Sequence, residues 1–157
     1  MILGYTQAGK TTAAIILAKH LNCNYANTSD RLIEDFAEHT GYDADLVFKN
    51  KPKWRNQLFS YGRGRQATDA LYPQSAQLKH ADILTGLRNH NEIEAARESK
   101  LYDAVIWIAR KGCKRGSTDK LSPSDADFII DNNDTKDKLA DMLLSLVKSL
   151  SLRPSIS

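Results

Sequence analysis

The sequence has few cysteines and no long apolar run. Cys23 and Cys113 are the only cysteines in 157 residues, too few and too far apart for a disulfide framework or a zinc site. No apolar stretch approaches the roughly 18 residues that a membrane-spanning helix needs. We therefore expect a cytoplasmic protein with no membrane partner. We also expect no signal peptide, because the first recognisable motif begins at Gly4.

A strong excess of charge is missing too. The net charge is +3, which permits polyanionic partners such as DNA without requiring them. Hydrophobic residues make up 41% of the chain and charged residues 26%, so the sequence can bury an ordinary soluble core. At this length we expect a single domain over residues 1–157.

What the sequence does contain is a complete phosphate-binding loop. Residues 4–11, GYTQAGKT, match the pattern G-x-x-x-x-G-K-[ST]. An apolar strand end precedes the loop, and residues 12–21 continue as a predicted helix whose N-terminal dipole faces the anion. Lys10 supplies a charge for the β- and γ-phosphates, and Thr11 supplies a hydroxyl as a ligand for Mg²⁺. We predict that ATP and Mg²⁺ bind here, through Gly4, Gln7, Ala8, Gly9, Lys10, Thr11 and Thr12.

Predicted strands and helices alternate along the rest of the chain. After the first strand, further strands are predicted at 23–27, 81–85, 104–109 and 128–130. Further helices are predicted at 31–38, 52–61, 92–97 and 135–150. This alternation is typical of an α/β fold, and we predict a three-layer sandwich around a parallel sheet of about five strands. Ligands then bind beyond the carboxyl ends of the strands, where the phosphate loop lies.

A phosphate loop alone does not separate kinases from other nucleotide-binding classes. GTPases carry a base-reading Asn-Lys-x-Asp element, which this sequence lacks, and motor ATPases usually need a longer chain. Four stretches instead resemble the phage-type deoxynucleoside monophosphate kinases, a branch near the adenylate and dephospho-coenzyme A kinases. They are 4–12 (GYTQAGKTT), 25–30 (YANTSD), 83–95 (ILTGLRNHNEIEA) and 127–135 (DFIIDNNDT). One position departs from the family pattern, because Gly86 stands where an aspartate is usual.

This resemblance implies a reaction, a location and roles for single residues. The reaction is transfer of the ATP γ-phosphate to a deoxynucleoside monophosphate, in the host cytoplasm if the chain is phage-encoded. Asp30 is the best-placed catalytic acid and would contact a substrate hydroxyl or a Mg²⁺-bound water; alternatively it caps a helix. Arg31 would grip an acceptor phosphate or face solvent. Arg88 would bind a substrate phosphate or pair with Glu92, and Asn132 would lie beside the adenine or serve as a turn residue.

A basic segment with interleaved aromatic residues runs from Lys49 to Gln66. In nucleotide kinases this part of the chain, residues 45–75, carries the acceptor-binding region. We predict that Arg55, Arg63 and Arg65 bind the acceptor phosphate, with glycines at 62 and 64 letting the backbone approach it. The alternative is a solvated basic helix whose aromatic residues face the core.

A charged, turn-rich segment follows the strong apolar strand at 104–109. In this fold class residues 110–125 form a mobile lid, whose arginines neutralise charge in the transition state. We assign Arg115 to catalysis and Arg110 to nucleotide binding, with Gly112 and Gly116 as hinges. The alternative is a plain charged surface loop.

Two other functions fit the same residues. A related kinase would phosphorylate 5-hydroxymethyluracil bases within phage DNA, with the basic segment following backbone phosphates and an aromatic ring stacking an extruded base. A non-catalytic nucleotide-binding module is the third interpretation, and Gly86 is its only support. The oligomeric state is left open, a homodimer included.

Overall fold

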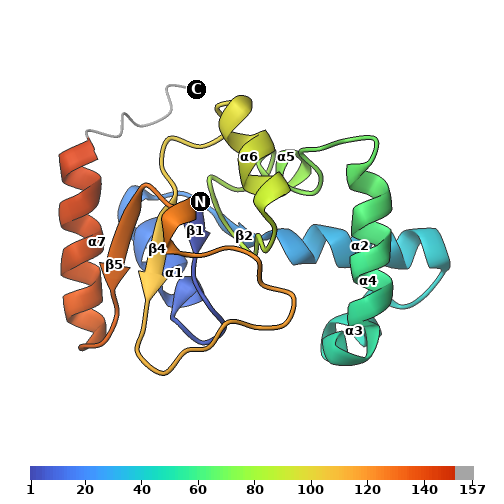
Figure 1. Ribbon diagram of the computed structural model, residues 1–157, viewed down its shortest axis with the longest axis horizontal. Coiled ribbons are helices and arrows are strands. Elements are labelled where there is room, and N and C mark those ends of the chain that lie inside the picture. The colour runs from blue at the N-terminus through green and yellow to red at the C-terminus, as the bar shows by residue number, and fades with distance from the viewer. Residues whose placement is uncertain (151–157) are drawn as a thin grey trace.

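A sheet of five parallel strands lies at the centre of the structure, with β1 in its middle (Figure 1). The computed structural model describes residues 1–150. The sheet has the order β2-β3-β1-β4-β5, formed by β1 (Ile2–Leu3), β2 (Tyr25–Asn27), β3 (Ile83–Thr85), β4 (Ile106–Ala109) and β5 (Phe128–Asp131). The predicted α/β fold with a five-stranded parallel sheet is confirmed.

Helices follow the strands in the predicted alternation. They are α1 (Lys10–Leu21), α2 (Thr28–Thr40), α3 (Ala44–Lys49), α4 (Lys51–Gln66), α5 (Gln74–Gln77), α6 (His90–Glu98) and α7 (Lys136–Leu150), with a 3₁₀ helix, η1 (Pro123–Asp125), before β5. None of the helices within residues 1–150 is long and apolar enough to cross a membrane.

Both faces of the sheet are covered, because successive residues of a strand point to opposite sides. Ile2 and Ile108 pack with buried residues of α1 and α7 on one face. Leu3 and Trp107 pack on the other face, together with Ile93 of α6. The central strands are therefore apolar on both sides, as their sequences predict for a buried parallel sheet.

Helices α2, α3 and α4 extend to one side of the sheet (Figure 1) and have a core of their own. Phe36, Val47 and Trp54 are buried in it, and Leu58 joins them. The aromatic residues of the basic segment are divided, since Trp54 faces this core whereas Phe59 stays 45% exposed. Phe59 is thus available at the surface of α4.

Two boundaries in this region differ from the sequence prediction. The helix predicted at 52–61 runs on to Gln66 in α4. At Gly62 the helix packs closely against α2: a Cβ on this residue would lie 3.3 Å from the side chain of Leu32. The absence of a side chain lets the two helices approach, and this packing supports the helix beyond residue 61. Glycines 62 and 64 thus both lie within α4, where Gly62 lines a cavity described below, and the expected approach of this backbone to a phosphate stays a prediction. The short helix α3 was not predicted at all.

Because all five strands are parallel, their carboxyl ends meet at one edge of the sheet. Beyond this edge the chain continues as Gly4 after β1, Thr28 after β2, Gly86 after β3, Arg110 after β4 and Asn132 after β5. The phosphate loop, the predicted acceptor residues and the predicted lid all start from here.

Candidate active site

The phosphate loop connects β1 directly to α1 and depends on its two glycines. Gly4 and Gly9 have φ angles of 147° and 102°, in the region that favours glycine. A Cβ on Gly4 would lie 2.6 Å from the carbonyl oxygen of Ile108, and a Cβ on Gly9 would collide with the side chain of Asn132. The loop can therefore follow this tight path only with glycine at both positions, as the motif predicts.

Lys10, the first residue of α1, folds back over the loop. Its Nζ donates hydrogen bonds to the carbonyl oxygens of Gly4 (2.7 Å) and Tyr5 (2.8 Å). Burial, and then the positive charge of Arg88, lower the pKa of Lys10, while Asp119 and Cys113 oppose this shift. The electrostatic neighbours of the lysine thus come from the β3–α6 connection and from the segment after β4.

Asn132 fastens the far end of the sheet to the phosphate loop. Its Nδ2 donates to the carbonyl oxygen of Ala8 (2.8 Å), and its backbone N–H donates to the carbonyl oxygen of Ala109 (2.7 Å). The next residue, Asn133, accepts a hydrogen bond from the backbone N–H of Lys111. The asparagine turn therefore braces the loop and also fixes where the segment after β4 begins, next to the exposed Arg110.

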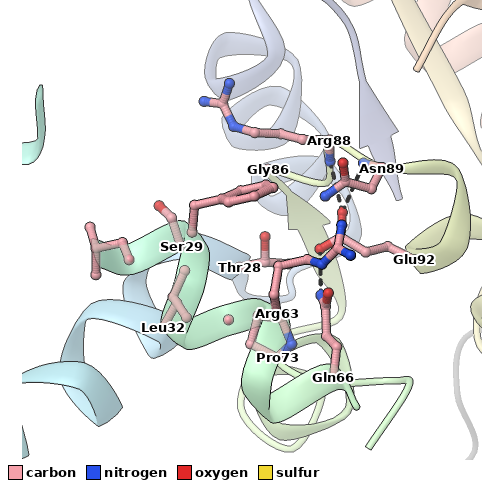
Figure 2. A pocket seen from close by; sticks show the side chains of 13 residues that line it. Thr28, Ser29, Leu32, Arg63, Gln66, Pro73, Gly86, Arg88, Asn89 and Glu92 are labelled. Carbon is pink, nitrogen blue, oxygen red and sulfur yellow. Dashed lines mark hydrogen bonds between the residues drawn. The ribbon is translucent and has the colours of Figure 1, made fainter. Parts of the chain in front are cut away.

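A cavity of about 100 Å³ lies between α2, α4 and the connection from β3 to α6 (Figure 2). Its lining residues are Thr28, Ser29, Leu32, Leu58, Phe59, Gly62, Arg63, Gln66, Pro73, Gly86, Arg88, Asn89 and Glu92. We call it the acceptor cavity. Two of the predicted substrate-binding residues, Arg63 and Arg88, line it, and in Figure 2 they lie on opposite sides of Gly86.

The acceptor cavity combines positive charge, hydroxyl groups and an apolar wall. Its one acid, Glu92, is buried and already bound, because it accepts hydrogen bonds from the backbone N–H groups of Arg88 (3.0 Å) and Asn89 (2.9 Å) and from Gln66 Nε2 (2.9 Å). The cationic groups of the cavity are the two arginines, of which Arg88 is paired with Asp119, a residue that does not line the cavity, so the cavity suits an anion. The hydroxyls of Thr28 and Ser29 add uncharged polar contacts.

Gly86 has a structural reason for replacing the aspartate expected from the resemblance. Its φ angle is 106°, and a Cβ on this residue would lie 2.8 Å from Thr28 Oγ1 and collide with Asn27. The end of β3 is therefore packed against the start of α2, and no side chain fits between them. A carboxylate at this position is incompatible with the observed packing.

Arg88 binds Glu92 through its backbone and the segment after β4 through its side chain. Its backbone N–H binds Glu92, while its guanidinium Nη1 lies 2.7 Å from Asp119 Oδ1 and 3.2 Å from Thr118 Oγ1. The predicted side-chain pair with Glu92 is therefore wrong. The arginine instead links the acceptor cavity to the predicted lid.

Asp30 and Arg31 do not line the acceptor cavity. Asn27 caps α2, accepting a hydrogen bond from the N–H of Ser29 (2.9 Å), so the alternative role of Asp30 as the cap is wrong. Asp30 lies in the first turn, 3.6 Å from Lys51 Nζ. Arg31 Nη2 lies 2.6 Å from Asp35 Oδ1. Since Asp35 is buried and also accepts from the hydroxyl of Tyr72, Arg31 is engaged in a structural network.

The three arginines predicted to bind the acceptor phosphate all lie on α4, but they have different surroundings. Only Arg63 lines the acceptor cavity, where its guanidinium also lies 5.8 Å from the ring centre of Phe59. Arg65 lies over the ring of Tyr72 at 4.9 Å, and Arg55 is exposed elsewhere on α4. Residues two positions apart do not face each other on a helix, so the structure does not bring the side chains of Arg63 and Arg65 together.

The predicted lid is folded back on itself and on Arg88. Arg115 donates from Nε to the carbonyl oxygen of Asp119 (2.7 Å) and from Nη2 to that of Lys120. The backbone N–H of Lys120 in turn donates to the carbonyl oxygen of Arg88 (2.7 Å). Asp119, which no local pattern marks, is the acid that sequence analysis missed. It lies 31 residues from Arg88 in the chain, so only the fold shows the contact.

Solved structures provide the match that sequence comparison does not. No protein-family model matches the chain, and a comparison with curated proteins finds no match. Shikimate kinase from Aquifex aeolicus is similar with a TM-score of 0.55 and 16% identity, over 96% of this chain and 96% of that one. An unliganded sugar kinase from a Janibacter species gives a TM-score of 0.52 and 13% identity, over 99% and 95%.

The chain has the fold of these kinases. At such low identities the likeness extends to the fold and no further. The likeness covers 96% of the first structure and 95% of the second, so it is not confined to the phosphate loop and its flanking elements. Neither structure is a deoxynucleoside monophosphate kinase, and the resemblance of the four sequence stretches to that family stays a prediction.

Proposed function

We propose that this protein is a kinase that transfers the γ-phosphate of ATP to a small anionic acceptor held between Arg63 and Arg88. The observation that carries the proposal is the acceptor cavity itself, which is lined by two arginines beside a phosphate loop. The kinase fold of the two similar structures supports it. Among such acceptors, the sequence resemblance favours a deoxynucleoside monophosphate.

The donor side of the site fits ATP. Gly4 and Gly9 keep the loop free of side chains that would block a phosphate, and the N-terminus of α1 faces the loop. Gln7, Ala8 and Thr12 complete the cradle. We assign Arg110 and Asn132, at the ends of β4 and β5, to the neighbourhood of the nucleotide.

The residues present also fit a magnesium ion. Thr11, exposed at the start of α1, supplies the single protein hydroxyl that a phosphate-bound Mg²⁺ commonly takes. No group of three or more acidic, histidine or cysteine side chains forms a metal site within residues 1–150, and a phosphate-bound Mg²⁺ needs none. When bound, the ion neutralises charge on the β- and γ-phosphates.

Positioning and charge neutralisation then provide the catalysis. Lys10 faces the transferred phosphoryl group from the loop, and Arg88 lies near enough to influence its pKa. Arg115 would join them if the segment after β4 closes over the nucleotide. Asp30, in the first turn of α2 beside Ser29 of the cavity, is the acid that we assign to contacting a substrate hydroxyl or a Mg²⁺-bound water.

The test is an acceptor panel incubated with γ-labelled ATP. It includes the deoxynucleoside monophosphates, the ribonucleoside monophosphates, and uncharged sugars and hydroxy acids of the size of shikimate, since the similar structures are a shikimate kinase and a sugar kinase. We expect label on an anionic acceptor and none with the Lys10→Ala protein. Labelling of uncharged sugars alone would contradict the role of the two arginines.

A DNA kinase remains the second candidate, because one observation favours it. Phe59 is 45% exposed on the same helix as Arg63, and Lys53 and Arg55 are also exposed there. An exposed aromatic ring among basic residues can stack a base and follow a phosphate backbone. Hydroxymethyluracil-containing DNA therefore belongs in the panel. Binding that falls steeply with salt would identify it, whereas binding of a mononucleotide falls much less.

A further inference from the structure

An acid from the segment after β4 is paired with Arg88 at the acceptor cavity. Asp119 Oδ1 lies 2.7 Å from Arg88 Nη1, and its Oδ2 accepts a hydrogen bond from the backbone N–H of Gly116 (3.1 Å). The side chain of Arg88 is 49% exposed, whereas that of Asp119 is only 12% exposed. A solute can therefore reach the arginine, while the carboxylate is held in place by its own loop.

The same contact ties a whole segment to the acceptor cavity. Thr118 Oγ1 also accepts from Arg88, and the backbone N–H of Lys120 donates to the carbonyl oxygen of Arg88. Arg115 binds the carbonyl oxygens of Asp119 and Lys120, so its guanidinium is held with them. Residues 115–120 thus dock on one arginine through several polar contacts.

We propose that Asp119 is an internal competitor for the anion of the acceptor. Its carboxylate occupies the guanidinium of Arg88, and an incoming phosphate or carboxylate takes its place. Because this guanidinium holds the side chains of Thr118 and Asp119, the exchange loosens the segment to which Arg115 belongs and lets Arg115 turn toward the nucleotide. The inference rests on the proposed function only in that the acceptor is anionic.

The competition makes Asp119 an affinity-determining residue. A carboxylate already paired with Arg88 must be displaced before the acceptor binds, which weakens binding of every acceptor that uses this arginine. An acceptor with a compact, doubly charged phosphate displaces the carboxylate more readily than a weaker anion does. The contact therefore favours strongly anionic acceptors over neutral ones of the same size.

Limited digestion with trypsin tests the contact without any turnover. Cleavage after Lys114 reports release of the segment. We expect Asp119→Asn and Arg88→Gln each to speed this cleavage by roughly fivefold, the upper range for a partly exposed ion pair, and the double variant to be no faster than either. Asp141→Asn, on the exposed side of α7, is the matched control and should digest like the wild type. Wild-type rates in both single variants would overturn the proposal.

Inorganic phosphate provides a test on the unaltered protein. Phosphate should speed cleavage of the wild type after Lys114, while potassium chloride at equal ionic strength should do so less, and phosphate should have no further effect on Asp119→Asn. An equal effect of the two salts on the wild type would overturn displacement by an anion.

Kinetics then test the affinity. With an acceptor from the panel, Asp119→Asn should lower the acceptor KM by roughly fivefold and leave the KM for ATP unchanged. An unchanged or raised acceptor KM would contradict competition. If the panel gives no turnover, the proposed function fails, whereas the digestion result still decides whether Asp119 holds Arg88.

Discussion

Arg63 and Arg65 show that the position of an arginine on α4 decides whether its side chain reaches the acceptor cavity. Both are arginines of the last turn of α4, and both lie over an aromatic ring. Yet Arg63 lines the acceptor cavity, while Arg65 covers Tyr72 on another side of the helix. Their chemistry is identical, so a comparison of the two isolates the effect of position.

We therefore predict different kinetics for Arg63→Gln and Arg65→Gln. Loss of a hydrogen-bonded charge at Arg63 should raise the acceptor KM by about tenfold or more, because bonds to charged groups each contribute about 1.5–3 kcal/mol. The KM for ATP should stay unchanged. Arg65→Gln should leave both constants near the wild-type values. Steady-state kinetics with each substrate varied in turn provides the measurement, and equal effects of the two substitutions would refute the assignment.

Other single residues show where sequence analysis reaches its limit. The loop from Gly4 to Thr11 could be predicted because its motif is local and each position has its own chemical reason. The ion pair of Arg31 with Asp35 was missed although both residues lie in the predicted helix at 31–38, four positions apart, which is the spacing at which a salt bridge forms on a helix. Asp119 could not be found at all, because the contact with Arg88 is made by the fold.

At the scale of elements, hydrophobic pattern predicted the sheet well and the α2–α4 region less well. The strands are short runs that alternate with helices, apart from the four helices between β2 and β3, and this pattern leaves few alternatives. We predicted the end of α4 too early because glycine normally weakens a helix by about 1 kcal/mol. The packing that compensates for Gly62 comes from Leu32 of another helix, which the local sequence does not show. Helix α3 is only six residues long, too short for a periodic signal.

The two glycines of α4 allow a matched test of this packing. We predict that Gly62→Val destabilises the protein by about 1–3 kcal/mol, because even a Cβ would lie 3.3 Å from Leu32 and two methyl groups must follow. Gly64→Val introduces the same side chain where nothing lies within 4 Å of the Cβ, so it should be neutral or slightly stabilising. Urea denaturation measures both. Equal changes in the free energy of unfolding for the two variants would show that packing against Leu32 does not explain Gly62.

At the scale of the whole molecule, the parallel sheet explains why residues distant in sequence form one site. Strand order β2-β3-β1-β4-β5 places the phosphate loop between the ends of β3 and β4, so that Arg88 and Asp119 of the predicted lid both come close enough to Lys10 to influence its pKa. The fold class could be predicted from alternation alone, whereas this order could not. The acceptor cavity is lined in part by side chains of α2 and α4, and the pattern of strands does not determine where these side chains lie.

Lys10 connects the site to the stability of the entire fold. Binding of ATP with Mg²⁺ to the folded protein alone should raise the thermal midpoint by roughly 5–10 °C at a ligand concentration of about 100 Kd. Lys10→Ala removes a partly desolvated cation whose pKa is lowered by burial, so we expect it to leave the midpoint of the free protein nearly unchanged.

The same substitution should abolish most of the rise with ATP, because the β- and γ-phosphates lose their nearest charge. Lys19→Ala, on the exposed side of the same helix α1, is the control and should keep the full rise. Differential scanning fluorimetry with and without ATP and Mg²⁺ provides the measurement. A Lys10→Ala protein that is stabilised by ATP as strongly as the Lys19→Ala protein would show that the nucleotide binds elsewhere on the molecule.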